Sequence, residues 1–367
     1  MPHKETRLRN HNAIIFARLS CASLFWLFAI LFSIVYSQPP AQQNKPANNG
    51  IWIGPNELAQ LPASGPAWEN LLRAANQSLG SPNLSDQDDP TNVLVMAKAL
   101  VFARLKKEKY RREVATALRA LVSQNTENAG RTLALGRELI AYVIAADLIG
   151  LRSYNATLDN KFRKRLRELR SKTLEGRTLI STHEERANNW GTHAGASRIA
   201  IAAYLNDRAE LKRCAQVLRG WLGDREAYSG FKFGGLIWQA DSTRPVGVNP
   251  KNAKRNGHSI DGVLPEEQRR AGGFTWPPQK ENYVYEALQG ALVQAVLLRR
   301  AGYEVWNWRD RALLRAFQWL DHEAHFPATG DDTWQIHLIN HFYHTDFPAT
   351  IPSVPGKNVG WTDWTHN

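Results

Sequence analysis

The chain has 367 residues, with 46 Lys and Arg against 34 Asp and Glu, a formal net charge of +12 at pH 7. A hydrophobic content of 43 % and a total of two cysteines exclude a disordered chain, a disulfide scaffold and a collagen-like chain. The length fits one large domain or two ordinary ones, and 13 Trp, 13 Phe and 10 Tyr supply ample apolar surface for a core.

Residues 1–37 are typical of an export signal and are set apart from the fold. A basic start precedes residues 19–36, which are uncharged and apolar, and the small Ser37 follows. An apolar run of this length also fits an uncleaved N-terminal membrane anchor. We therefore expect a periplasmic or secreted protein. Once the signal is removed, Cys214 is the remaining cysteine, so no disulfide can form within the chain.

The excess of positive charge suits a polyanionic partner, because a positive potential raises the local concentration of an acidic ligand. Nucleic acid, anionic lipid and acidic polysaccharide all fit this description. A basic surface that only keeps the protein soluble explains the charge equally well.

Residues 38–50 are rich in Pro, Gln and Asn and predict a disordered linker, so the folded domain is expected at 51–367. Beyond it, apolar residues recur at intervals of three and four, which indicates helices. The predicted helices are 67–79, 91–105, 109–122, 133–148, 156–170, 188–205, 208–222, 281–301, 308–322 and 334–342. Thr182–Glu185 (THEE) is interpreted as a capping box before the sixth of them.

Residues 223–278 interrupt the helical pattern with Gly, Pro, Asn and Lys, and an irregular stretch of this length is usually functional. About ten helices in antiparallel hairpins favour an all-α fold, either an α-solenoid or an α/α toroid. No clean repeat of solenoid period is present, which favours the toroid.

The richest local motif starts at Asn188. Asn189, His193 and Ser197 are spaced at i, i+4 and i+8, so they form one polar stripe on an otherwise apolar helix. The alternative to a functional stripe is a buried hydrogen-bond network or an N-terminal cap. Glycines in the same helix lower its stability by roughly 1 kcal/mol each and indicate a close approach to the backbone.

Two later segments carry further candidates. The long loop contains His258, a residue type used for general acid–base catalysis, and Arg270, which can hold a carboxylate by two parallel hydrogen bonds. The neighbouring carboxylates, Glu266 and Glu267, and Arg269 are equally well explained as solvated loop charges. In the next helix Tyr283 lies on a face of small and polar residues, and Tyr285 points the opposite way and is assigned more readily to the core.

The order of these blocks resembles the all-helical alginate lyases and related polyuronate lyases. The resemblance rests on Asn188-Asn189-Trp190, on 261–265 (DGVLP) followed by Arg269-Arg270, and on the helix containing Tyr283, and a weaker match at 57–62 extends it over most of the chain. It implies an incomplete (α/α)6-7 toroid with one long inserted active-site loop. It also implies β-elimination on an acidic polysaccharide, without a cofactor, and no nucleic-acid partner.

The residues suit this chemistry. Removing the C5 proton of a 4-linked uronate requires neutralising the adjacent carboxylate, for which Asn189 and Arg270 are suitable donors. His258 and Tyr283 are assigned as the base and acid in either order, and His193 positions the sugar or replaces His258. Alginate lyases usually have a histidine where Trp190 stands, so the chain looks closer to the glucuronan and mannuronan lyases. Asn188, Trp190, Arg269, Trp276 and Tyr285 are the predicted substrate contacts.

Three alternatives remain open at this stage. Histidines 337, 341 and 344 share a helix face and could bind zinc, although structural packing or a substrate contact explains them better, so no metal is predicted. A helical-toroid glycoside hydrolase would need a carboxylate pair such as Asp261 and Glu266. A basic envelope protein that binds polysaccharide without cleaving it is the third.

Overall fold

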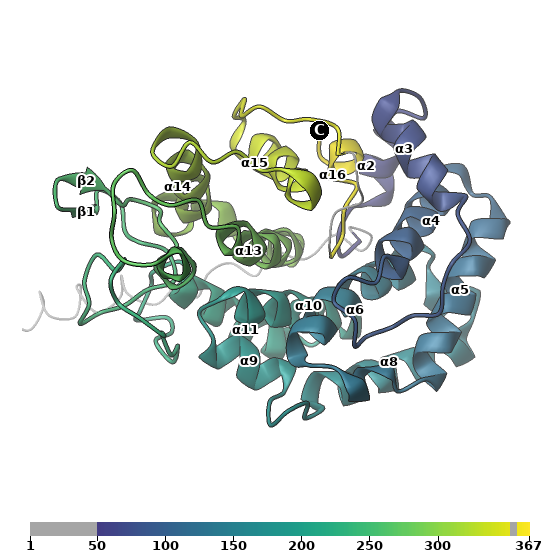
Figure 1. The fold of residues 1–367 in the computed structure, drawn as a ribbon. Coiled ribbons are helices and arrows are strands. Elements are labelled where there is room, and N and C mark those ends of the chain that lie inside the picture. Colours follow the sequence, from purple (N-terminus) through teal and green to yellow (C-terminus); the bar gives the residue numbers. More distant parts are fainter. Residues whose placement is uncertain (1–49, 353–357) are drawn as a thin grey trace, which may run out of the picture. The chain divides into compact units, whose positions relative to one another are not determined.

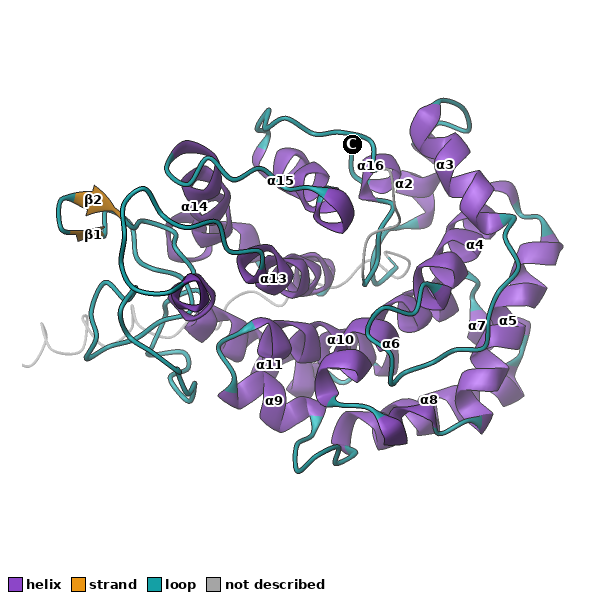
Figure 2. Cartoon of the chain, viewed as in Figure 1, coloured by secondary structure: helices purple, strands orange, loops and turns teal. Residues whose placement is uncertain are grey.

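The structure, a computed structural model, describes residues 50–352 and 358–367. The described residues all belong to one compact unit, Lys45–Asn367. The predicted signal and nearly all of the linker lie outside the described residues. Figure 2 shows that helices form almost all the regular structure of the described part, with one short strand pair, which confirms the all-α fold.

Four helices form the centre of the unit: α4 (Thr91–Leu105), α6 (Thr132–Leu148), α10 (Asn189–Leu205) and α13 (Tyr283–Arg300). They pack in series, α4 on α6, α6 on α10 and α10 on α13 (Figure 1). All four are buried on nearly every side. Their sequences explain this position, because a helix that is apolar all round has no face suited to water.

A second set of helices covers this centre: α3 (Pro66–Ala75), α5 (Glu108–Ser123), α8 (Ala156–Ser171), α11 (Arg208–Trp221) and α14 (Trp308–His322). Each has one buried apolar face and one exposed polar face. Because α3 and α5 pack on α4, and α8 and α11 pack on α10, covering and central helices alternate along the chain. This alternation is the arrangement expected of an α/α fold.

The last helices pack against the first. The series continues with α15 (Trp334–Tyr343), which contacts α13, and α16 (Thr362–Thr365), which contacts both α15 and α3. The indole of Trp361 donates to the Val93 carbonyl at 3.0 Å, and that of Trp364 donates to the Pro62 carbonyl at 2.8 Å. These long-range hydrogen bonds tie the C-terminal segment to the helices that begin the unit, which include α2 (Pro55–Gln60).

All ten predicted helices are present, with ends that differ from the prediction by a few residues. The predicted capping box was wrong: Thr182–Glu185 lie inside a separate helix, α9 (Leu179–Glu185), which is capped by Thr178 and Ser181. Four other short helices, α2, α7 (Leu151–Tyr154), α12 (Pro265–Gln268) and α16, were also not predicted. One or two turns are too short to show an apolar period.

The long loop between α11 and α13 is more ordered than predicted. It contains the antiparallel strands β1 (Lys254–Arg255) and β2 (His258–Ser259), then α12 and the 3₁₀ turn η2 (Arg269–Ala271). The other 3₁₀ turns are η1 (Thr126–Ala129), η3 (Val305–Asn307) and η4 (Gly330–Asp332). In the described residues no helix is both long and apolar enough to cross a membrane.

Candidate active site

Helices α10 and α13 run in the same direction and approach very closely. A Cβ added to Gly290 would collide with the backbone of Thr192, and the side-chain amide of Gln294 donates to the Thr192 carbonyl at 2.8 Å. Gly195 faces the same Gln294 and has no room for a side chain. The close approach predicted at the glycines of α10 is thus made by the protein itself at Gly195, and the contact brings the N-terminal parts of the two helices together.

Glu267 joins three of the predicted catalytic residues at this end. Its Oε1 accepts from the backbone N–H of Asn189 at 2.5 Å, and its Oε2 lies 2.7 Å from Nε of Arg270. The Arg270 guanidinium lies over the ring of Tyr283, 4.0 Å from its centroid. Three segments distant in sequence therefore converge: the start of α10, the turn after α12 and the start of α13. Tyr283 is 44 % exposed, so its phenol faces solvent.

Glu267 is 1 % exposed, and burial raises its pKa from 4.5 to about 7, although the Arg270 charge and the Asn189 N–H act in the opposite direction. The ionised form of Glu267 holds Arg270 by an ion pair. Below about pH 7 the protonated form loses this attraction. Glu267 thus links the position of Arg270 to pH.

A Glu267→Gln variant is expected to lose activity mainly above pH 7 and to flatten the acidic limb of the pH–activity profile, because Gln imitates the protonated side chain. The stability of the variant relative to the parent should increase, whereas its activity decreases. The folded-state pKa of Glu267 is raised, so the parent loses stability as pH rises from about 4.5 to 7, and the variant avoids this loss. Activity and melting temperature measured from pH 5 to 9 test both effects. An unchanged pH profile would contradict the link.

Trp190 lies between two arginines that the sequence analysis did not select. The guanidinium of Arg186 is 4.3 Å from the Trp190 ring centroid, and that of Arg131 is 5.3 Å away. Burial, followed by the charges of Arg177 and Arg270, lowers the pKa of Arg186. These arginines precede α6 and α10 in short connections, where apolar periodicity gives no signal. The result is a positively charged surface around an indole.

A pocket of about 250 Å³ adjoins the start of α10. It is lined by Arg177, Glu185, Arg186, Ala187, Asn188, Lys232, Phe233, Gly234 and Glu266. Arg177 and Lys232 share Glu185, at 3.4 and 2.8 Å, and in the described part of the chain Arg186 has no ion pair with a carboxylate. Asn188 Oδ1 is buried here without a hydrogen-bond partner. The pocket is therefore predominantly cationic.

Two of the predicted substrate contacts, Arg269 and Tyr285, interact with other residues of the protein. Arg269 lies 2.5 Å from Glu266, which also accepts from the Gly234 N–H at 2.9 Å, so Arg269 borders the pocket through this ion pair. Tyr285 is buried, and its hydroxyl donates to the Phe326 carbonyl at 2.5 Å, as expected of a core residue and not of a substrate contact.

The polar stripe of α10 faces inward. Asn189, His193 and Ser197 are all buried, and the Ser197 hydroxyl donates to the Gly136 carbonyl of α6 at 2.8 Å. His193 has no exposed surface, so it is not placed to contact a sugar on the surface directly. Ser197 therefore belongs to a buried hydrogen-bond network, which was the alternative to a functional role for the stripe.

His258 lies in β2 and stacks on Trp276, with ring centroids 4.4 Å apart and an interplanar angle of 12°. Both side chains are partly exposed. Among the described residues, no hydrogen bond or ring contact connects either of them to the Arg270–Tyr283 pair. Their catalytic and binding roles stay predictions. The neighbouring Trp238 is buried against Phe274.

The other candidate groups are not arranged as a site. Asp261 pairs with Arg315, whereas Glu266 pairs with Arg269, so the two carboxylates proposed for a hydrolase serve separate ion pairs. Within the described ranges, no three His, Cys, Asp or Glu side chains are grouped so that they could hold a metal. His337 is buried and contacts the Thr350 carbonyl through Nε2 at 3.1 Å.

Residues 83–231 match the family model of alginate lyase, a span that includes α4, α6, α10 and α11, with the paired asparagines. Glu267, Arg270 and Tyr283 follow the matched span. A search of curated proteins found no match. Residues 83–231 therefore carry an alginate lyase domain, which supports an alginate lyase assignment and identifies the protein as a polysaccharide lyase.

Proposed function

We propose that the protein is exported and cleaves a uronate-containing polysaccharide, alginate or polymannuronate or glucuronan, by β-elimination. The observation that carries the proposal is the connected set of Asn189, Glu267, Arg270 and Tyr283 beside a cationic pocket. The set combines a fixed cation with an exposed phenol, and the pocket offers further cations to a polyanion.

Arg270 is suited to neutralise the carboxylate of the sugar that loses its C5 proton. Its Nε is paired with Glu267, so the terminal N–H groups of the fork remain for a substrate carboxylate. One well-aimed donor of this kind lowers the barrier of such a reaction by about 3 to 4 kcal/mol. Glu267 holds the guanidinium in place before the substrate arrives.

Tyr283 is suited to proton transfer. In the elimination a base removes the C5 proton, the C4–C5 double bond forms, the C4–O4 bond breaks, and an acid protonates the departing oxygen. The phenol of Tyr283 takes one of these two roles, and His258 is proposed for the other, in the order that the stereochemistry of the sugar requires. Each transfer accelerates the reaction by roughly 10² to 10⁴.

The cationic pocket is proposed to hold the neighbouring uronates of the polymer. Arg186 has no carboxylate partner among the described residues and lies over the ring of Trp190, so the indole supports a guanidinium that is available to a substrate carboxylate. Arginine recognises carboxylates in a planar geometry and stacks on aromatic rings. This combination favours an acidic sugar over a neutral one.

Product analysis tests the reaction. Incubation with alginate, polymannuronate and glucuronan is expected to give products with a new C4–C5 double bond, detected by ultraviolet absorbance, whereas cellulose gives none. Saturated products would identify a hydrolase, and retained binding without turnover would identify a polysaccharide-binding protein. No product from any uronate polymer would contradict the proposal.

Export is tested separately by expressing the full chain in a bacterium and sequencing the N-terminus of the periplasmic and secreted protein. We expect the mature chain to begin close to Gln38. Retention of residues 1–37 in a membrane fraction would identify an anchor.

A further inference from the structure

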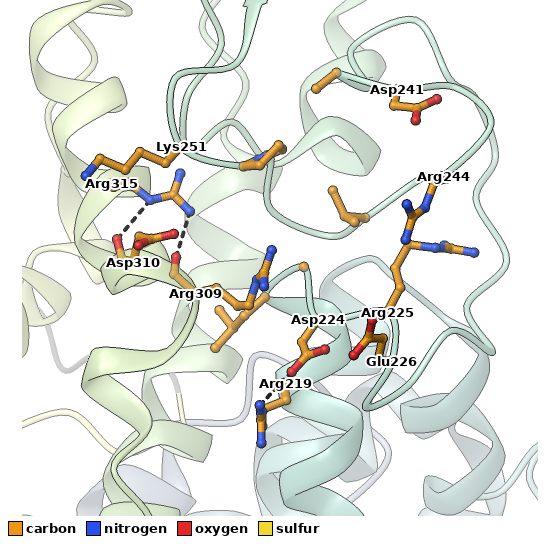
Figure 3. Close-up of a pocket in the computed structure, with 15 residues that line it drawn as sticks. Arg219, Asp224, Arg225, Glu226, Asp241, Arg244, Lys251, Arg309, Asp310 and Arg315 are labelled. Atoms are coloured by element: carbon orange, nitrogen blue, oxygen red, sulfur yellow. Dashed lines mark hydrogen bonds and ion pairs between the residues drawn. The ribbon is translucent and has the colours of Figure 1, made fainter. Parts of the chain in front are cut away.

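A second and larger pocket, of about 540 Å³, lies between the C-terminal end of α11, the loop 240–251 and the start of α14. Its volume is within the range of about 300 to 1,000 Å³ that small-molecule sites occupy. Figure 3 shows charged side chains from all three segments placed around this hollow. None of the residues lining it lines the pocket at Asn188 or belongs to the set that contains Arg270 and Tyr283.

Two of the arginines in this pocket hold its walls together. Arg315 donates to the backbone carbonyls of Arg309, Asp310 and Asn249 at 3.1, 3.0 and 2.9 Å, and also pairs with Asp261. Arg219 lies 2.7 Å from a carboxylate oxygen of Asp224. These interactions join α14 to the loop and α11 to the turn that follows it. Both side chains are therefore engaged and are not counted as ligand-binding groups.

Four other cations have no such carboxylate. In the part of the chain that the structure describes, Arg225, Arg244, Lys251 and Arg309 form no ion pair. Arg225 donates from Nη1 to the Pro245 carbonyl at 2.6 Å, which orients it without neutralising its charge. Arg244 and Lys251 are exposed. The pocket thus retains the capacity to bind anionic groups.

Three carboxylates line the same pocket without an ion pair among the described residues: Glu226, Asp241 and Asp310. A ligand that offers only negative oxygens, such as phosphate or sulfate, would be attracted by the cations and repelled by these carboxylates. A neutral sugar would satisfy the carboxylates through its hydroxyl donors and leave the cations without a partner. An acidic sugar presents a carboxylate and several hydroxyls, so it matches both sets.

We propose that this pocket is a second binding site, which holds a carboxylate-bearing oligosaccharide segment of the substrate polymer away from the cleavage site. The identity of the ligand as part of the substrate rests on the proposed function. A second contact on the same polymer raises the effective concentration of the chain at the cleavage site. The second site should therefore lower KM for long polymers and leave the cleavage of short oligosaccharides unchanged.

The test uses the full chain carrying Tyr283→Phe, to prevent cleavage, and a mannuronate tetrasaccharide and a glucuronate tetrasaccharide as calorimetric probes. Adding Arg244→Ala and Lys251→Ala is expected to remove one bound tetrasaccharide per chain. The matched control is Lys161→Ala with Lys164→Ala, which removes the same charge from the exposed face of α8. Because the substituted side chains are exposed, we expect the melting temperature to be unchanged. Tetrasaccharide binding by the single variants at 244 and 251 serves as a second measurement.

Without Tyr283→Phe, the Arg244→Ala/Lys251→Ala variant is expected to raise KM for the polymer several-fold at unchanged kcat. In the Tyr283→Phe background, equal binding of the tetrasaccharides with and without Arg244→Ala/Lys251→Ala would overturn the proposal. No binding in either case would overturn it as well. Binding of inorganic phosphate or cellotetraose as tight as that of the acidic tetrasaccharides would also overturn it. Loss of one tetrasaccharide in a protein that cleaves no uronate polymer would refute the proposed function and leave the binding site in place.

Discussion

Tyr283→Phe is expected to reduce the cleavage of uronate polymers by roughly 10² to 10⁴, the contribution of one positioned acid or base, with little change in melting temperature. The substitution removes only the hydroxyl. The ring stays in place under Arg270, and the side chain is already largely exposed, so the folded state loses almost no packing. Initial rates followed by ultraviolet absorbance, together with thermal unfolding, measure the two effects.

Tyr285→Phe is the matched control, because it removes a hydroxyl two residues along the same helix. The Tyr285 hydroxyl donates to the Phe326 carbonyl inside the core, so its loss should lower stability and leave the rate per folded molecule unchanged. His258→Ala, measured in parallel, tests the second proton-transfer group. If Tyr283→Phe keeps most of its activity, the phenol has no part in the proton transfers.

Arg270→Ala is expected to reduce kcat by roughly 10² to 10³, which corresponds to losing one donor aimed at the developing negative charge. The variant also leaves the buried Glu267 carboxylate without its cation, so the pKa of Glu267 should rise further. Because Glu267 then has no guanidinium to position, the acidic limb of the pH–activity profile should flatten. Kinetics against pH on a single polymer measure both changes.

Arg270→Lys is expected to restore only part of the activity. A single ammonium group cannot hold Glu267 and bind a substrate carboxylate side by side, as the guanidinium fork can. Arg269→Ala is the neighbouring control: its guanidinium is paired with Glu266 at the edge of the pocket, so its loss should raise KM more than it lowers kcat. Equal effects of Arg269→Ala and Arg270→Ala on kcat would contradict the assigned role of Arg270.

Most of the helices could be predicted because their signal is local. Thr91–Leu105 and Trp308–His322 were predicted with the observed ends, since apolar residues at intervals of three and four mark the buried side of each helix. The short α9 was missed: THEE was assigned as a capping box, but it lies inside α9, whose cap is formed by Thr178 and Ser181. One turn of residues resembles a cap wherever it occurs, and only the surrounding fold shows which helix it belongs to.

By itself, the sequence determined an all-α protein in which Asn189, Arg270 and Tyr283 carry the resemblance to polyuronate lyases. The tertiary structure decided which of these residues meet. Glu267 was indistinguishable from a solvated loop charge until its burial, its long-range contact with the Asn189 N–H and its ion pair with Arg270 made it the link between them. The tertiary structure also placed His193 inside the core and His258 on a separate hairpin. The physical reason is that residue type and spacing report local backbone structure, whereas burial and charge pairing depend on segments separated by tens of residues.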